Sequence, residues 1–173
     1  MPVTTDDGTL LALARDLVAA LRARGWRLAT AESCTGGGVA HAITSIAGSS
    51  DVFDRGFVTY SNEAKAEMLG VPADTIERDG AVSEAVAIAM ADGALCGSRA
   101  DVAVAITGVA GPGGGTEAKP VGMVCFAWAR SGGTTEVRTH RLPGDRAAVR
   151  AASVRIAMVG LLAMARSGGI GGN

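Results

Sequence analysis

A nearly uninterrupted apolar run in the middle of the chain constrains the fold more than any other segment. Residues 101–106, Asp-Val-Ala-Val-Ala-Ile, have the length of a strand. They lack the apolar–polar alternation that is typical of a strand with one solvent-exposed face. Such a strand has to be covered on both faces, which is typical of a central strand in a sheet flanked by helices. The glycine-rich stretch 107–115 that follows predicts a turn or a segment lying against a ligand.

Helical and extended segments alternate along the rest of the chain. Helices are predicted from Leu10 to Leu21, over 39–46, from Ser61 or Asn62 to Leu69, over 84–95, and from Arg146 to about Arg166; strands are predicted over 26–30, 56–60, 101–106, 121–129 and 134–142. The order predicts a three-layer α/β/α sandwich with a mostly parallel or mixed central sheet, formed as a single domain over residues 1–173. Residues 167–173 are expected to form a loose tail.

Composition and charge exclude several functional classes. The 16 Lys and Arg residues against 17 Asp and Glu give a formal net charge of -1, so neither an overall field nor a basic run favours nucleic acid as a partner. The longest apolar stretches, such as 156–165, are shorter than the roughly 20 residues that cross a bilayer, so no membrane span is expected. Three cysteines without a close pair, and a start unlike a secretory signal, favour the cytoplasm.

Metal and cofactor signatures are equally sparse. The three cysteines and two histidines show none of the close spacings of zinc sites, so no metal is expected. A carboxylate-only magnesium site from Glu32, Asp51 or Asp54 stays open as an alternative. The glycine-rich segments match neither a Walker A motif nor G-x-G-x-x-G, so neither a nucleoside triphosphate nor a Rossmann-type dinucleotide cofactor is indicated, and no cofactor is expected.

Three polar segments each follow a predicted strand. They are 32–37, 60–65, and 107–115 together with Lys119. Ligands of open α/β sheets collect outside the carboxyl ends of the strands, so the three segments are expected to share one site.

Ser33 is the candidate nucleophile of the first segment. A hydroxyl at a turn from strand to helix can lie beside the free N–H groups of the helix N-terminus, and the amides near Thr35 and Gly36 are candidate oxyanion donors. The alternative is that Ser33 or Thr35 only caps the helix.

Cys34 is a rival nucleophile in the same segment. A thiol needs a partner that stabilises its thiolate, and neither His41 nor His140 is obviously placed to provide one. A buried and inert thiol is the favoured interpretation.

Lys65 is the candidate base, because a serine hydroxyl needs a proton acceptor and histidine is scarce. Its place early in a helix, near the positive end of the helix dipole, predicts a lowered pKa. Tyr60, at the end of a predicted strand, is a candidate partner that relays or orients the proton. The alternatives are an exposed Lys65 flanked by Glu63 and Glu67, and a packed Tyr60.

The start of the last helix offers a place for an anion. Asp145 and Arg146 lie at the start of that helix, and exposed amides there and in the glycine-rich loop, together with one fixed cation, can hold a phosphate. This pattern alone is a weak indication of a nucleotide ligand.

The residues in these blocks closely resemble the carboxy-terminal domain of the CinA family. The resemblance spans nearly the whole chain and is carried by Ala31-Glu32-Ser33-Cys34-Thr35-Gly36-Gly37, by the segment 56–65, by Gly80-Ala81-Val82-Ser83-Glu84 and by Thr107-Gly108-Val109-Ala110-Gly111-Pro112. Stand-alone members of this family are amidases that hydrolyse nicotinamide mononucleotide to nicotinate mononucleotide and ammonia, in pyridine-nucleotide recycling. Larger members carry an amino-terminal domain that is not expected in this chain.

The resemblance implies a role for each candidate residue. Ser33 is implied as the nucleophile, Lys65 as the general base and Tyr60 as their partner, and the residues implied near the nucleotide substrate are Thr107, Gly108 and Arg146. It also implies self-association, for which the apolar stripe Met158, Leu161, Leu162 and Met164 is a candidate face unless it packs on the sheet. Two other functions remain open: a non-catalytic nucleotide-binding or competence-associated protein, and an amidase for another small carboxamide.

Overall fold

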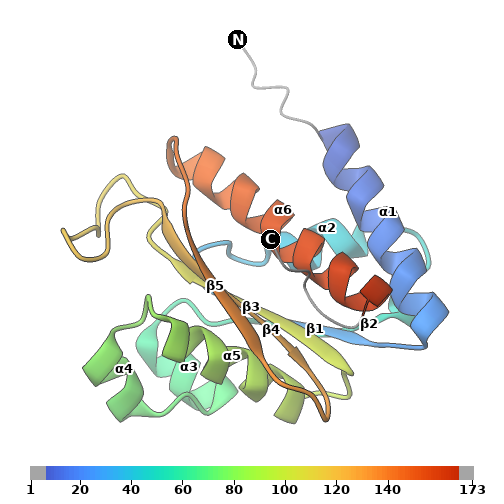
Figure 1. The fold of residues 1–173 in the computed structure, drawn as a ribbon, viewed down its shortest axis with the longest axis horizontal. Coiled ribbons are helices and arrows are strands. Elements are labelled where there is room, and N and C mark those ends of the chain that lie inside the picture. Colours follow the sequence, from blue (N-terminus) through green and yellow to red (C-terminus); the bar gives the residue numbers. More distant parts are fainter. Residues whose placement is uncertain (1–6, 168–173) are drawn as a thin grey trace.

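The computed structural model describes residues 7–167, which form helices and strands in strict succession around one sheet (Figure 1). The helices are α1 (Asp7–Arg24), α2 (Gly38–Thr44), α3 (Asn62–Leu69), α4 (Ala73–Asp79), α5 (Glu84–Cys96) and α6 (Arg146–Ser167), with a short 3-10 turn at Ser49–Asp51. The strands are β1 (Leu28–Glu32), β2 (Phe53–Val58), β3 (Val102–Gly108), β4 (Met123–Arg130) and β5 (Glu136–Arg141).

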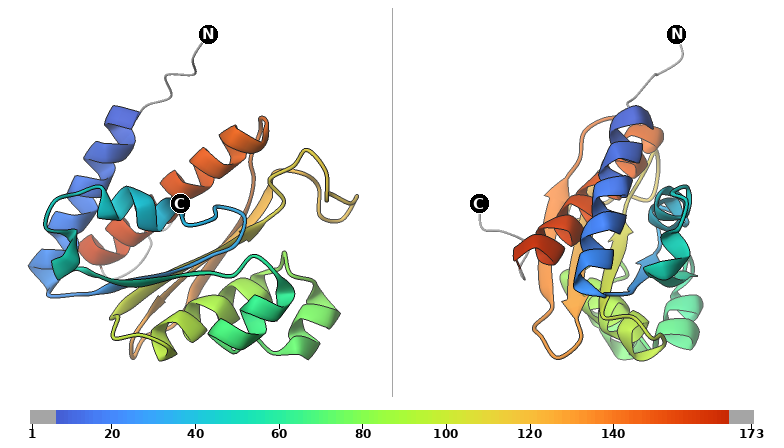
Figure 2. Two further views of the ribbon diagram at one scale, coloured as in Figure 1. Left: turned by 180° about the vertical axis from the view of Figure 1, so that it is seen from behind. Right: turned by 90° about the vertical axis from the view of Figure 1, so that its right-hand side faces the viewer.

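The sheet is mixed, with the strand order β2-β1-β3-β4-β5. Strands β2, β1 and β3 are parallel, whereas β4 and β5 add to the edge as an antiparallel pair. Helices α1, α2 and α6 cover one face of the sheet, and α3, α4 and α5 lie on the other (Figures 1 and 2). The predicted three-layer α/β/α architecture with a mixed central sheet is therefore confirmed.

Strand β3 is buried on both faces, as its apolar sequence predicted. Val102, Val104 and Ile106 belong to the core beneath α1, α2 and α6. Ala103 and Ala105 belong to the core beneath α5. Because alternate residues of a strand point to opposite faces, this one segment contributes to both cores.

The observed strand ends differ from the predicted ones in a way that matters for the site. β1 runs on to Glu32 and β3 to Gly108, so the chemistry-bearing residues begin inside or directly after the strands. β2 ends at Val58, two residues before Tyr60. Helix α4 was not predicted, because none of its residues is buried and its sequence therefore carries no apolar periodicity.

By length and composition alone, helix α6 is long and apolar enough to cross a membrane. Half of its most apolar 18-residue stretch, however, is buried inside this fold. Its stripe of Met158, Leu161, Leu162 and Met164 is buried in the core against the sheet and α1. The stripe therefore packs within the chain and is not a free partner face. Ser167, predicted as the first residue of a loose tail, belongs to α6, and the other residues of that prediction, 168–173, lie outside the described residues.

Candidate active site

The three polar segments meet at the carboxyl ends of β1, β2 and β3, where they enclose a pocket of about 270 Å³. Six of the eight predicted site residues line it: Ser33, Tyr60, Lys65, Thr107, Gly108 and Arg146. Thr35 and Gly36 do not. Residues from the ends of all three parallel strands thus lie around one pocket.

Ser33 and Lys65 lie side by side in this pocket. The Nζ atom of Lys65 is 3.1 Å from Ser33 Oγ and donates a second hydrogen bond of 2.9 Å to the carbonyl of Thr59. Lys65 is 1% exposed and Ser33 is 9% exposed. Helix α3 holds the lysine in place, with Ser61 capping the helix by accepting a bond from the amide of Ala64.

The environment of Lys65 disfavours its charged form more than water does. Burial lowers the pKa of the Lys65 amine below its ordinary value, and the charge of a Cys34 thiolate would only oppose this shift. Among residues 7–167, no salt bridge includes Lys65. The sequence predicted the direction of this shift, from a desolvated lysine near the positive end of a helix dipole; in the structure desolvation is the largest cause.

Tyr60 lies at the rim of the pocket and is 58% exposed. Its hydroxyl accepts a hydrogen bond of 2.7 Å from Arg146 Nη2, and Arg146 Nη1 donates to the carbonyl of Gly111 at 2.8 Å. The structure therefore joins Tyr60 to Arg146 and the glycine-rich loop, and not to Ser33 or Lys65 as its predicted role requires.

The N-terminus of α2, predicted to face an oxyanion, is occupied by a carboxylate of the chain itself. Glu32 is fully buried and accepts bonds from the amides of Val39 and Ala40, at 2.9 and 3.1 Å. It also accepts the hydroxyl of Thr35 at 2.7 Å. The helix dipole and its first free amides are thus satisfied before any substrate arrives.

The turn after Ser33 leaves other donors available. The amide of Gly36 donates to the carbonyl of Ser33 at 3.0 Å, so it is not the free oxyanion donor that the sequence suggested. Within residues 7–167, the amides of Cys34 and Thr35 make no hydrogen bond to another residue. Of these two residues, Cys34 lines the pocket and Thr35 does not, so the Cys34 N–H is the candidate oxyanion donor.

The glycine-rich loop contributes shape more than charge. Thr107 is buried, and its hydroxyl donates to the carbonyl of Ala81 at 2.8 Å. A side chain on Gly108 would bring its Cβ within 2.9 Å of the Met123 carbonyl, so only glycine fits there. Lys119 bonds the carbonyl of Asp79 at the end of α4 and does not line the pocket.

Cys34 does not have the properties of a nucleophile. Burial raises the pKa of its thiol to about 11, so the thiol is uncharged near neutral pH. Neither histidine assists it, because His140 packs against Phe126 and His41 lies in α2, whose residues do not line the pocket. The inert thiol expected from the sequence agrees with this environment.

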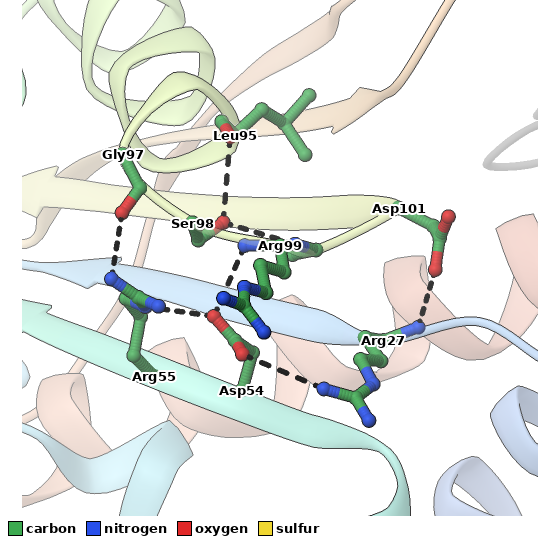
Figure 3. Close-up of polar contacts among 9 residues, drawn as sticks. Arg27, Asp54, Arg55, Leu95, Gly97, Ser98, Arg99 and Asp101 are labelled. Carbon is green, nitrogen blue, oxygen red and sulfur yellow. Dashed lines mark hydrogen bonds and ion pairs between the residues drawn. The ribbon is translucent and has the colours of Figure 1, made fainter.

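The three carboxylates considered for magnesium lie apart and have other partners. Glu32 caps α2 as described, and Asp51 pairs with Arg22. Asp54 is held at the opposite end of the sheet by Arg55, by Arg27 and by the amide of Arg99 (Figure 3). Among residues 7–167 no group of three metal-ligating side chains comes together.

Sequence reasoning missed two groups that build the site. The carbonyl of Thr59 orients Lys65, and a backbone oxygen leaves no signature in a sequence. Glu32 was considered only as a metal ligand, although an acidic residue at the end of a buried strand, just before a turn and a helix, is a signal for an internal helix cap.

Fold and site together define an α/β domain with a serine hydroxyl and a desolvated lysine at the carboxyl ends of its parallel strands. The sequence profile of the CinA C-terminal domain matches residues 10–165, and the chain belongs to that family. The expected resemblance is thereby confirmed.

Relatives of known name and structure agree with this assignment. Nicotinamide-nucleotide amidohydrolase PncC of Escherichia coli K12 is 57% identical over 144 residues, which cover 83% of this chain and 87% of that protein. A CinA-like protein of Mycobacterium sp. strain JLS is 57% identical over 156 residues, covering 90% of this chain and 36% of the longer relative. The crystal structure of competence/damage inducible protein CihA from Agrobacterium tumefaciens has a TM-score of 0.88 at 49% identity, covering 90% of this chain and 94% of that one.

Proposed function

We propose that this protein is a nicotinamide-nucleotide amidohydrolase that converts nicotinamide mononucleotide to nicotinate mononucleotide and ammonia in pyridine-nucleotide recycling. The observation that carries the proposal is the buried amine of Lys65, which lines a pocket 3.1 Å from Ser33 Oγ and forms no salt bridge within residues 7–167. The names of relatives as similar as the Escherichia coli amidohydrolase supply the substrate. A cytoplasmic location fits the three free cysteines.

The proposed chemistry is acyl transfer through Ser33. The uncharged Lys65 amine takes the hydroxyl proton while Ser33 Oγ attacks the carboxamide carbon. The oxyanion that forms is stabilised by the N–H group of Cys34, which lines the pocket directly after Ser33. The C–N bond then breaks, and Lys65 returns its proton to the leaving nitrogen, so ammonia departs and an ester remains on Ser33.

Hydrolysis of that ester follows the same steps with water as the nucleophile. Lys65 takes a proton from water, and the hydroxide attacks the ester carbonyl. Ser33 Oγ leaves with the proton from Lys65, which releases nicotinate mononucleotide and restores the free enzyme. The Thr59 carbonyl keeps the amine aimed at Ser33 through both halves of the cycle.

The phosphate of the substrate is proposed to lie near Arg146. Arg146 lines the pocket and is held rigidly by the Tyr60 hydroxyl and the Gly111 carbonyl. A fixed guanidinium is well suited to a phosphate, and none of the residues that line the pocket carries a carboxylate that would repel one. Tyr60 is proposed to act here, by positioning Arg146, and not in proton transfer.

A comparison of wild type with Ser33→Ala tests the proposal. The wild-type protein is expected to release ammonia from nicotinamide mononucleotide, and Ser33→Ala to lose this activity by more than about 10²-fold while still binding the nucleotide. Ser131→Ala, in the exposed turn between β4 and β5, is the matched control and should behave as wild type.

Two results would contradict the proposal. Full activity in Ser33→Ala would remove serine from the mechanism. Tight binding of the nucleotide by wild type without ammonia release would instead favour the non-catalytic binding function, and release from other carboxamides alone would change the substrate.

A further inference from the structure

The turn that carries Ser33 is held by charged side chains from two directions. Glu32 binds it from the sheet, through the hydroxyl of Thr35 and the first amides of α2. Arg150 binds it from α6: its Nε donates to the Cys34 carbonyl at 3.2 Å, and its Nη2 donates to the Thr35 carbonyl at 3.3 Å. One guanidinium therefore bridges two consecutive carbonyls of the turn.

Arg150 makes these contacts from outside the pocket beside Ser33. It lines a separate cavity of about 530 Å³ between α1, α2 and α6, and it is not among the residues that line the smaller pocket. Arg146, one helical turn earlier on α6, is the residue that lines that pocket. A role of Arg150 in the reaction consequently has to act through the turn.

Peptide geometry says what Arg150 controls. The peptide bonds of this turn are trans, and in a trans peptide the C=O of one residue and the N–H of the next point in opposite directions. Fixing the Cys34 carbonyl on Arg150 therefore directs the Thr35 N–H away from α6. In the same way, the bond from the Gly36 amide to the Ser33 carbonyl fixes the direction of the Cys34 N–H.

We propose that Arg150 is a positioning residue: by binding the carbonyls of Cys34 and Thr35 it holds the turn in which the Cys34 N–H serves as an oxyanion donor for the reaction of Ser33. The inference rests on the proposed function for its substrate, but its physical content is the conformation of the turn that carries Ser33. Arginine suits this task because its planar fork reaches two carbonyls at once, which a lysine ammonium does with less geometric control.

Steady-state kinetics with Arg150→Ala, Arg150→Lys and Arg155→Ala test the inference. Arg155 is an exposed arginine farther along α6 and serves as the matched control. Arg150→Ala is expected to lower kcat for ammonia release roughly 10- to 100-fold, less than the full loss of an oxyanion donor, with KM nearly unchanged. Arg150→Lys should recover only part of the rate, and millimolar guanidinium added to Arg150→Ala should restore part of kcat. Arg155→Ala should match wild type.

A second readout does not depend on the natural substrate. The rate at which a fluorophosphonate labels Ser33, followed by mass spectrometry, should fall in Arg150→Ala and not in Arg155→Ala. If wild type releases no ammonia but shows this labelling pattern, the proposed function fails and the inference stands. If neither ammonia release nor labelling of Ser33 occurs in wild type, both fail.

Three further results would overturn the inference alone. They are an unchanged kcat in Arg150→Ala, a raised KM with an unchanged kcat, and a lost rate that guanidinium does not restore in a protein with a lowered melting temperature. The last of these would assign Arg150 a purely structural role.

Discussion

The amine of Lys65 shows how one side chain can be made reactive by its surroundings. In the described part of the chain it forms hydrogen bonds with the hydroxyl of Ser33 and the carbonyl of Thr59, and both are compatible with an uncharged amine. Removing a lysine from water without an anionic partner disfavours its charged form, which is why the pKa is lowered. The same desolvation that prepares the base also costs stability, as is common at functional sites.

Lys65→Met should separate these two effects. Methionine keeps most of the volume without the amine, so we expect activity to be lost and the free energy of unfolding to rise by about 1 kcal/mol. The unfolded chain binds the lysine proton up to its ordinary pKa of 10.5, whereas the folded protein loses it at lower pH. The increase in the free energy of unfolding should therefore be largest below the pKa of Lys65 in the folded protein and should shrink as the pH approaches 10.5. Urea unfolding over a pH series measures it; a less stable variant would contradict this account.

The position of Lys65 depends in turn on how helix α3 packs against α5. Gly93 of α5 lies directly beneath the last residue of α3, and a Cβ at that position would come within 2.0 Å of the Leu69 carbonyl oxygen. A backbone oxygen cannot move aside alone, so any side chain at position 93 has to push the helices apart. The close approach of the two elements is thus a condition for the 3.1 Å contact in the site.

Gly93→Ala is expected to lower the free energy of unfolding by about 1–3 kcal/mol, the usual cost of overpacking. It should also lower kcat, because a displaced α3 carries Lys65 away from Ser33. Gly8→Ala is the control: Gly8 is exposed in α1 with open space around its Cα, and the substitution should stabilise the helix by roughly 0.5–1 kcal/mol. Chemical unfolding and ammonia release on both variants check this. Equal stability of the two would contradict the close helix contact.

At the scale of the whole molecule, the two ends of the sheet have different tasks. The carboxyl ends of the parallel strands hold the pocket, while the opposite end is closed by Asp54, whose side chain is only 9% exposed. Asp54 accepts bonds from Arg55 and the amide of Arg99 and lies 3.8 Å from Arg27, so it joins β2 to the segments that precede β1 and β3 (Figure 3). The amide of Arg99 and the Arg55 guanidinium hold the pKa of this carboxyl below its usual range.

Asp54→Asn should weaken this junction without affecting catalysis. We expect the free energy of unfolding near neutral pH to fall by about 1 kcal/mol, since charge-assisted hydrogen bonds are lost. Because the folded pKa is lowered, the contribution of Asp54 is present above the ordinary pKa of 3.8 and is lost as the pH falls through the folded value. The free energies of unfolding of the variant and the wild type should therefore become equal in acid.

The control is Asp16→Asn, which removes an exposed ion pair with Arg166 and should change the free energy of unfolding by less than about 0.5 kcal/mol. A change in kcat for Asp54→Asn would contradict the separation of the two ends.

Much of the architecture was readable from local pattern. The apolar run of β3 required cover on both faces, and the alternation of helices and strands then required three layers. The topology of parallel strands placed three polar segments at one edge, which brought Ser33 and Lys65 into one predicted site although 32 residues separate them. These features depend on hydrophobic periodicity and on residue type, and both can be read directly from the amino-acid sequence.

The partners inside that site were decided only by the packed structure. Tyr60 bonds Arg146, 86 residues away, and Arg150 reaches Cys34 across 116 residues. The amide of Gly36 donates to the carbonyl of Ser33 within the same turn. Glu32 accepts hydrogen bonds at the N-terminus of α2, where the developing oxyanion of the substrate was expected to bind. Hydrogen bonds are short and directional, so which donor meets which acceptor depends on differences of an ångström in the placement of whole elements. No local sequence pattern contains that information, because it depends on how the helices pack against the sheet.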